Sequence, residues 1–83
     1  MTAPDWLAQR DGALRQGLSS DVWNVLLGGQ PQYRLSAHPA GGKYTCSVIQ
    51  TVNGERLDTP KHYPSVPEAL KGGLDELRAR LGW

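Results

Sequence analysis

The side chains that most often carry chemistry are few in this chain and widely spaced. The 83 residues include one cysteine, Cys46, and two histidines, His38 and His62. A structural zinc site needs four Cys or His ligands, usually in closely spaced pairs, so these three residues do not form one. A single cysteine cannot form an internal disulfide, and Cys46 is predicted to pack inside as a small hydrophobic residue. We therefore expect no metal and no other cofactor.

Motifs for catalysis and for phosphate binding are lacking as well. The run Gly41, Gly42, Lys43 is too short to form a phosphate-binding loop. Glu55 and Asp58 are predicted on opposite faces of a hairpin, so they do not form the carboxylate pair of a glycosidase. We expect the protein not to be an enzyme, and no small-molecule substrate is implied.

Five basic residues are candidates for contacts with nucleic acid, because cationic side chains neutralise phosphates. They are Arg34, His38, Lys43, Lys61 and Lys71. The chain has nine Lys and Arg against eight Asp and Glu, a formal net charge of +1, whereas nucleic-acid-binding domains usually show a strong basic excess. Such binding would depend on these residues converging in space, which the sequence does not show.

Four apolar residues near the chain ends are candidates for a protein interface: Trp6, Leu7, Leu14 and Trp83. Exposed tryptophans mark interfaces, because large aromatic side chains contribute much of the binding energy there. The alternative is that the N-terminal helix folds back and covers its own tryptophan. Neither a membrane-spanning run nor a signal peptide is recognisable, so we expect a cytosolic protein without a membrane partner.

Helical patterns predict the elements of the first third of the chain. Residues 4–18 are predicted as a helix, because a proline and an aspartate open the segment and apolar residues recur at spacings near four and seven. Residues 19–21 form a second start signal, and the apolar run 22–27, ended by two glycines, is predicted as a short buried helix. We expect one domain over residues 1–83, with residues 1–18 as an appendage to a core of residues 19–83.

Alternation of apolar and polar residues predicts strands in the middle of the chain. Residues 33–38 and 43–52 alternate in this way and are separated by a loop over residues 39–42. Asn53 and Gly54 are typical of a two-residue type I′ hairpin turn, which makes residues 55–59 a third strand.

That turn also predicts a register. It pairs Val52 with Glu55, Gln50 with Leu57 and Val48 with Thr59, so Leu57 shares a face with Val48. The other face carries mostly polar residues and is expected to remain in water.

A helix over residues 66–81 completes the prediction. Ser65 and Glu68 have the spacing of a capping box, an apolar stripe follows, and Gly82 supplies the stop. The fold class is therefore α+β: a three-stranded antiparallel meander packed on one face by helices, in the order α-α-β-β-β-α.

Residues 20–81 resemble the double-stranded RNA-binding domain, whose order is α-β-β-β-α. The likeness includes residues 31–33 entering the first strand, the small-residue loop 38–42, the strand 43–48, and a last helix that opens at Ser65. The resemblance implies RNA contacts from the first helix, from the loop between strands one and two, and from a lysine-rich start of the last helix. Here Val66 and Pro67 occupy the positions of the family's two lysines after the serine, and only Lys71 follows.

A looser likeness covers residues 43–81. A strand pair followed by a serine and a Glu-Ala-Leu helix start is similar to the antitoxin halves of some small toxin–antitoxin pairs. This likeness implies a partner-binding protein.

Two function hypotheses follow from the sequence. The leading hypothesis is a small non-catalytic binding module that acts through contacts with a protein partner or with itself. The alternative is weak binding of double-stranded RNA or DNA by the five basic residues.

Overall fold

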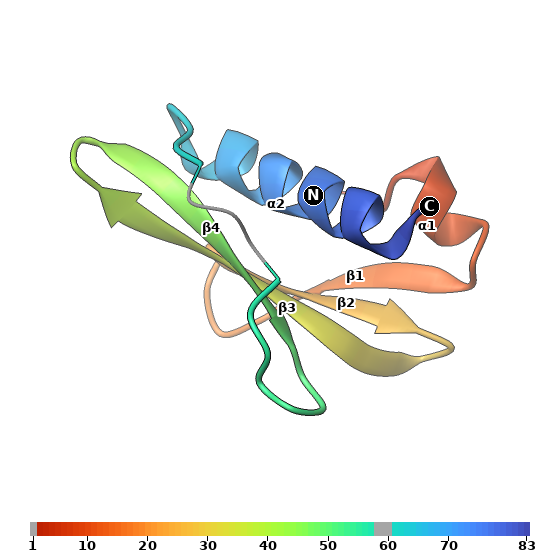
Figure 1. Cartoon of the computed structure of the whole chain (residues 1–83). Helices are drawn as coiled ribbons and strands as arrows, with labels where there is room; N and C mark the ends of the chain where they lie inside the picture. Colours follow the sequence, from red (N-terminus) through yellow and green to blue (C-terminus); the bar gives the residue numbers. More distant parts are fainter. Residues whose placement is uncertain (1, 58–60) are drawn as a thin grey trace.

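The chain folds into an antiparallel sheet with its two described helices on one side (Figure 1). The computed structural model describes residues 2–57 and 61–83. The strands β1 (Gly12–Gln16), β2 (Val22–Leu27), β3 (Gln30–Ala40) and β4 (Lys43–Gln50) lie side by side in chain order. Helix α2 (Val66–Leu81) packs on β3 and β4, and the short helix α1 (Asp5–Ala8) packs on β1. The α+β class is confirmed, with four strands in the sheet rather than three.

The prediction of a helix over residues 4–18 is wrong beyond its first turns. After α1, Asp11 adopts a left-handed φ of 56° and the chain turns into β1. Along β1 the half-buried Leu14 is followed by the exposed Arg15, which is the alternation of a strand. Leu18, which the helical pattern placed with Leu14, is fully exposed instead.

The second predicted helix, residues 22–27, is strand β2. It lies between β1 and β3. Two consecutive residues of β2, Val25 and Leu26, are both buried although their side chains point to opposite faces of the sheet. A strand whose side chains are buried on both faces has such a continuous apolar run. A short apolar run does not by itself distinguish a buried helix from an inner strand, and pairing with β1 and β3 decides in favour of the strand.

A β-bulge changes the register between β2 and β3. Leu26 pairs with Pro31, but the next residue, Val25, pairs with Tyr33, so Gln32 has no partner in β2. A bulge of this kind inserts one extra residue in one strand of an antiparallel pair. Because side chains alternate along a strand, the extra residue reverses which residues of β3 face each side beyond this point.

Two pairs of glycines make the tight turns on either side of β3. Gly28 and Gly29 have φ angles of 58° and 79°, and Gly41 and Gly42 have 57° and 81°. Positive φ at both central positions is the requirement of a type I′ hairpin turn. The expected loop over residues 39–42 is thus only its glycine pair, since β3 continues to Ala40 and β4 begins at Lys43.

The turn at Asn53 and Gly54 is longer than predicted. The backbone N–H of Gln50 donates to the carbonyl of Glu55 at 2.8 Å, and that of Gly54 donates back to the carbonyl of Gln50 at 2.8 Å. Four residues, 51–54, therefore form the loop, and the predicted pairing of Val52 with Glu55 is wrong. The side chain of Asn53 stabilises the loop by accepting a hydrogen bond from the backbone of Glu55 at 2.9 Å.

The register beyond this turn is shifted by two residues. Leu57 donates to the carbonyl of Val48 at 2.8 Å, whereas the prediction paired Leu57 with Gln50. A shift of two preserves the side-chain alternation, so Leu57 still packs against the core as expected. Within the described part of the third predicted strand, residues 55–57, Arg56 forms a single bridge to Ile49. Residues 58 and 59, and with them the predicted pair of Val48 with Thr59, lie outside the described residues.

Helix α2 begins and ends as its sequence predicts. The Ser65 hydroxyl accepts a hydrogen bond from the backbone N–H of Glu68 at 3.3 Å, and Gly82 adopts a left-handed φ of 74°. Gly73 lies directly against Cys46 of β4, which brings the helix close to the sheet. The buried apolar residues of the core come from α1, α2 and the three strands β2 to β4: Leu7, Val25, Leu35, Ala37, Cys46, Val48, Ala69, Leu70, Leu74 and Leu77.

Gly73→Ala tests this close approach, because helix propensity predicts an increase in the free energy of unfolding and packing predicts a decrease. Alanine stabilises a helix interior by about 1 kcal/mol relative to glycine, but here a Cβ would collide with the Cys46 side chain. We expect overpacking to dominate and to lower the free energy of unfolding by about 1–2 kcal/mol in urea denaturation. An increase in stability would contradict the close approach of α2 to β4.

Candidate functional site

Helices α1 and α2 leave one face of the sheet uncovered (Figure 1). The register of the strands brings three arginines into one row on this face. Asn24 of β2 pairs with Arg15 of β1 and with Arg34 of β3. Ile49 of β4 pairs with Arg34 and, beyond β4, with Arg56. Residues directly opposite each other share a face, and the helix-side position next to Arg34 is held by the buried Leu35. We call Arg15, Arg34 and Arg56 the arginine row and this side of the sheet the open face.

The spacing within the arginine row follows from the sheet. Neighbouring strands lie about 4.8 Å apart, so successive arginines, two strands apart, have their Cα atoms about 10 Å from each other. Arg15 and Arg34 are exposed. The Arg56 guanidinium donates to the Ser47 hydroxyl at 3.4 Å, which places it over β4 on the open face. The row therefore crosses the whole width of the sheet.

The charges of the strands have one sign only. Within their assigned ranges the four strands contain no aspartate or glutamate. On the open face, the exposed His38 and Lys43 near the β3–β4 turn add to the arginine row. Three of the described carboxylates lie on the other side of the sheet, on α2 at Glu68, Asp75 and Glu76. The other four lie outside the strands, at Asp5, Asp11, Asp21 and Glu55, and Glu55 is the chain neighbour of Arg56. A net charge near zero thus conceals a one-sided basic surface.

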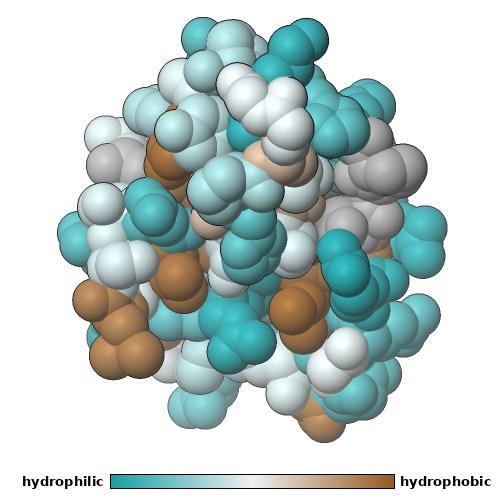
Figure 2. Space-filling view, turned by 90° about the vertical axis from the view of Figure 1, so that its left-hand side faces the viewer, coloured by the Kyte–Doolittle hydropathy of each residue, from teal (hydrophilic) through white to brown (hydrophobic). Residues whose placement is uncertain are grey.

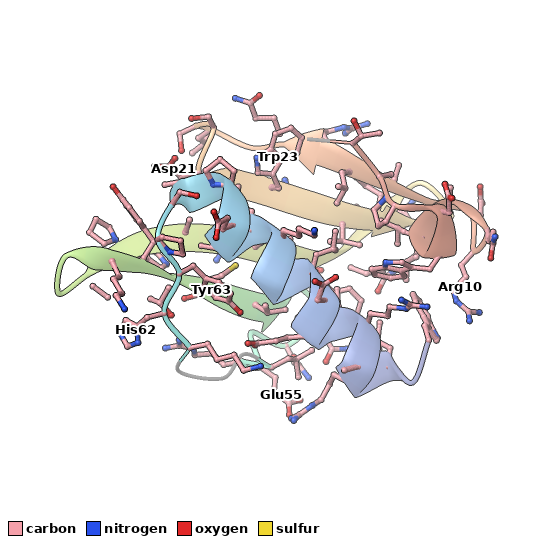
Figure 3. All side chains as sticks on the ribbon, turned by 90° about the horizontal axis from the view of Figure 1, so that it is seen from above. Arg10, Asp21, Trp23, Glu55, His62 and Tyr63 are labelled. Carbon is pink, nitrogen blue, oxygen red and sulfur yellow. The ribbon has the colours of Figure 1, made fainter. Side chains whose placement is uncertain are left out.

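The structure brings together three of the five predicted nucleic-acid contacts. Arg34, His38 and Lys43 lie on the open face, but Lys71 belongs to α2 on the opposite side. Lys61 is exposed next to His62, which Figure 3 shows pointing away from the helix.

Sequence reasoning did not select two members of the arginine row, Arg15 and Arg56, as contacts. Arg15 is missed because the apolar spacing of residues 4–18 predicts a helix, in which this side chain would not share a face with Arg34. The signal that would have revealed it is the alternation of Leu14 with its two neighbours, which is typical of a strand.

The four predicted interface residues all take part in packing within the chain. Leu7 is completely buried, and Leu14 packs against the same core. The rings of Trp6 and Trp83 lie 6.2 Å apart with an interplanar angle of 58°. Arg10 stacks over Trp83 at 4.6 Å. The short N-terminal helix thus folds back and covers its own tryptophan, and a role of these residues in an interface stays a prediction.

Arg78 strengthens this contact between the two chain ends. Its guanidinium lies 5.7 Å from the centre of the Trp6 ring and donates from Nε to the carbonyl of Trp83 at 3.0 Å. Cation–π contacts at such exposed sites contribute about 0.5–1 kcal/mol each. The N-terminal segment is therefore joined to the end of α2 and does not form a loose appendage.

A groove of about 640 Å³ lies on the helix side, between α2 and the start of β2. Trp23 lines it together with Leu70 and Leu74, and Asp21 and Lys71 stand at its rim. Figure 3 shows Asp21 and Trp23 beside the first turns of α2. Trp23, which belongs to the run 22–27 predicted to be buried, packs against the core but is only half-buried. Its indole N–H donates to the carbonyl of Ser20 at 2.9 Å.

The remaining reactive groups are internal. Cys46 is buried, as expected for a core residue, and its thiol donates to the carbonyl of Ser47 at 3.6 Å. The hydroxyl of the half-buried Tyr63 donates to the Glu76 carboxylate of α2 at 3.3 Å, and Figure 3 shows Tyr63 beside this helix. Burial raises the pKa of Tyr63 above its usual 10.0, and the nearby charge of Glu76 raises it further.

Two classes of site are absent from the described part of the chain. In residues 2–57 and 61–83, no three side chains of the His, Cys, Asp or Glu types converge to hold a metal ion. Neither described helix is long and apolar enough to cross a bilayer.

Trp6→Ala measures the role of the aromatic contact between the chain ends. Losing a half-buried indole and its ring partner is expected to lower the free energy of unfolding by about 2 kcal/mol. Urea denaturation followed by circular dichroism gives the value. A change below about 0.5 kcal/mol, the range of ordinary surface substitutions, would show that Trp6 does not hold the N-terminal segment in place.

The raised pKa of Tyr63 predicts a loss of stability at high pH. A phenol that binds its proton more tightly in the folded chain contributes stability below pH 10, and this contribution is lost as the pH rises above 10. Tyr63→Phe should flatten that part of the stability profile. If the free energy of unfolding falls equally steeply with pH above 10 in the native chain and in Tyr63→Phe, Tyr63 is not the group responsible.

Similarity to known proteins does not assign this chain. No family model matches it, and neither does any curated protein or any solved structure. The register of the sheet and the distribution of its charges are what bear on function.

Proposed function

We propose that the protein binds double-stranded DNA through the open face of its sheet, with the arginine row as the main contact. The observation that carries this proposal is the register that aligns Arg15, Arg34 and Arg56 across the sheet. Arginine presents a rigid fork of donors that matches phosphate oxygens and guanine edges. Three such side chains on a face whose strands hold no carboxylate favour a polyanion as ligand.

The lack of stacking residues on the open face favours a duplex over a single strand. Proteins that bind single strands stack bases on aromatic side chains. Here the strand aromatics Trp23, Tyr33 and Tyr44 pack against the core on the helix side. The described open face offers hydrogen-bond donors and cations, which suit the phosphates and base edges of paired strands.

Asn24 favours DNA over double-stranded RNA. It lies in the same row as Arg15 and Arg34. Asparagine reads adenine and arginine reads guanine in the major groove of B-form DNA, which is wide enough to admit elements of a sheet. The major groove of A-form RNA is too narrow for side chains to read. Two successive arginines, about 10 Å apart, fit within the groove width of about 12 Å, and the third, about 20 Å from the first, would reach phosphates beside the groove.

The other expectations from the sequence have less support. RNA binding in the manner of the double-stranded RNA-binding domain needs a first helix, and that segment of this chain is β2. Protein binding through the terminal tryptophans needs them to be accessible, and both are packed against the core and against each other.

A pair of double variants tests the proposal. Arg15→Ala/Arg34→Ala is expected to weaken binding to a short DNA duplex by at least tenfold, and to lower the slope of log affinity against log salt by about 2, one for each lost phosphate contact. Lys71→Ala/Arg80→Ala removes the same charge from exposed positions on α2 and should leave both quantities nearly unchanged. Fluorescence anisotropy at low and physiological salt measures them.

The ligand series is chosen to separate the classes of nucleic acid. The same sequence is offered as a DNA duplex, an RNA duplex and a single strand. Tighter binding to the RNA duplex or to the single strand would overturn the assignment to DNA. Equal loss of affinity in both double variants would show that overall charge, and not the open face, drives the interaction.

A further inference from the structure

The two edges of the sheet differ in whether other segments of the described chain form hydrogen bonds with their backbone. At the β4 edge, Tyr44 and Tyr63 exchange two backbone hydrogen bonds at 2.8 and 2.7 Å, and Leu57 donates to Val48 at 2.8 Å. At the opposite edge, β1 is the last strand of the sheet that the structure describes. An edge strand presents a row of backbone donors and acceptors to any strand that approaches.

Hydrogen bonds at the ends of β1 show which backbone groups face outward. Gly17 donates to Val22 at 2.7 Å, and Gly28 donates to Asp11 at 3.0 Å. The odd-numbered residues of this segment therefore direct their backbone groups toward β2. Because alternate residues of an antiparallel pair point in opposite directions, Gly12, Leu14 and Gln16 direct theirs away from the sheet.

We propose that this edge pairs antiparallel with β1 of a second copy of the chain, with Leu14 at the centre. The five residues of β1 are paired over their full length only when Leu14 lies opposite Leu14 and Gly12 opposite Gln16. In that register each outward N–H meets an outward carbonyl of the other copy. The contact is symmetric, so a single strand supplies both halves of it.

Leu18 identifies the occupant as a second copy. Its side chain is fully exposed just beyond the end of β1. Continuing the same register by two positions beyond Gln16 carries Leu18 toward the α1–β1 turn of the second copy, the turn that holds Arg10 and Asp11. There Arg10 lies 4.6 Å over the ring of Trp83, which in turn contacts Trp6. An apolar side chain surrounded by water in one copy would thus reach an aromatic cluster in the other, at both ends of the paired strands.

This pairing rests on the free edge and on Leu18 and is independent of DNA binding. Its two-fold axis is perpendicular to the sheet, so the open faces of both copies would lie on the same side. The two Arg15 side chains would flank the axis, and the two arginine rows would form one surface.

Sedimentation equilibrium without nucleic acid tests the association. The mass is expected to rise with concentration from 9.1 kDa toward twice that value. Leu18→Lys should keep it near 9.1 kDa, because a cation is placed beside Arg10 of the second copy. Val52→Lys is the matched control: Val52 is 77% exposed in the 51–54 loop, and the same change there should leave the association intact. Circular dichroism confirms that both variants fold.

Disulfide trapping tests the register. With Leu14 at the centre, Ala13 of one copy lies directly opposite Arg15 of the other in a non-hydrogen-bonded pair, with Cα atoms about 4.5 Å apart, within the range of a disulfide. Ala13→Cys/Arg15→Cys should therefore form a covalent dimer under oxidation, and Ala13→Cys alone should not. The native thiol of Cys46 is buried and does not interfere.

Three results would overturn the proposal. The first is a mass of 9.1 kDa at all concentrations together with no trapped dimer. The second is a dimer that Leu18→Lys leaves intact and that the double cysteine variant does not trap, which would assign the contact to another surface. The third is trapping by Ala13→Cys alone, which would contradict the register centred on Leu14.

Discussion

The unpaired Gln32 at the bulge between β2 and β3 is the feature on which the candidate site depends. The turn at Gly28 and Gly29 starts the pairing of these strands, and without an extra residue that pairing would bring Asn24 opposite Tyr33. The bulge moves Arg34 opposite Asn24 instead, and places Tyr33 and Leu35 on the helix side. One inserted residue therefore satisfies the core and aligns the arginines at the same time, because a slip of one position exchanges the two faces of a strand.

Packing on one side only is the second constraint. Gly73 lets α2 approach β4 closely enough to bury Cys46 and Val48, and α1 closes the other end of the same face through Leu7. In a chain of this size the apolar residues suffice for a single core layer. Hydrophobic surface is nevertheless not confined to that layer: Figure 2 shows separate hydrophobic side chains among hydrophilic ones at the surface of one end of the molecule. The opposite face of the sheet carries the arginine row and other polar side chains, together with the apolar Leu26 and Ile49.

Segregation of charge gives this small domain two distinct sides. The helix side carries carboxylates and cations together, including Asp75 and Arg78, so their fields largely cancel over distances beyond about 8–10 Å in salt. The strands carry only cations. A polyanion would therefore approach from the open face, and self-association along β1 would extend that face without covering it. The sheet geometry relates the two proposals, although each stands on separate observations.

Local patterns in the sequence determined helix α2 and strand β4, but not the loop and the register between them. Ser65, Glu68 and Gly82 specify the ends of α2 through hydrogen bonds between residues close in the chain, and alternation around Cys46 specifies β4. The side-chain alternation of that strand was also predicted correctly, although Ser47 on the face expected to remain in water is buried. Such signals depend on neighbouring residues alone, so they can be recognised without knowledge of distant contacts.

Tertiary structure alone decided the N-terminal half. Residues 22–27 suit a buried helix as well as an inner strand, and the choice is made by hydrogen bonding to β1 and β3, whose own partners lie far along the chain. Arg15 joins the candidate site only because of that choice. The alignment of Arg15, Arg34 and Arg56 depends further on a bulge and on a four-residue loop. The sequence by itself determined that basic residues were present; the pairing of distant strands, which sets every residue's face, decided that they would meet.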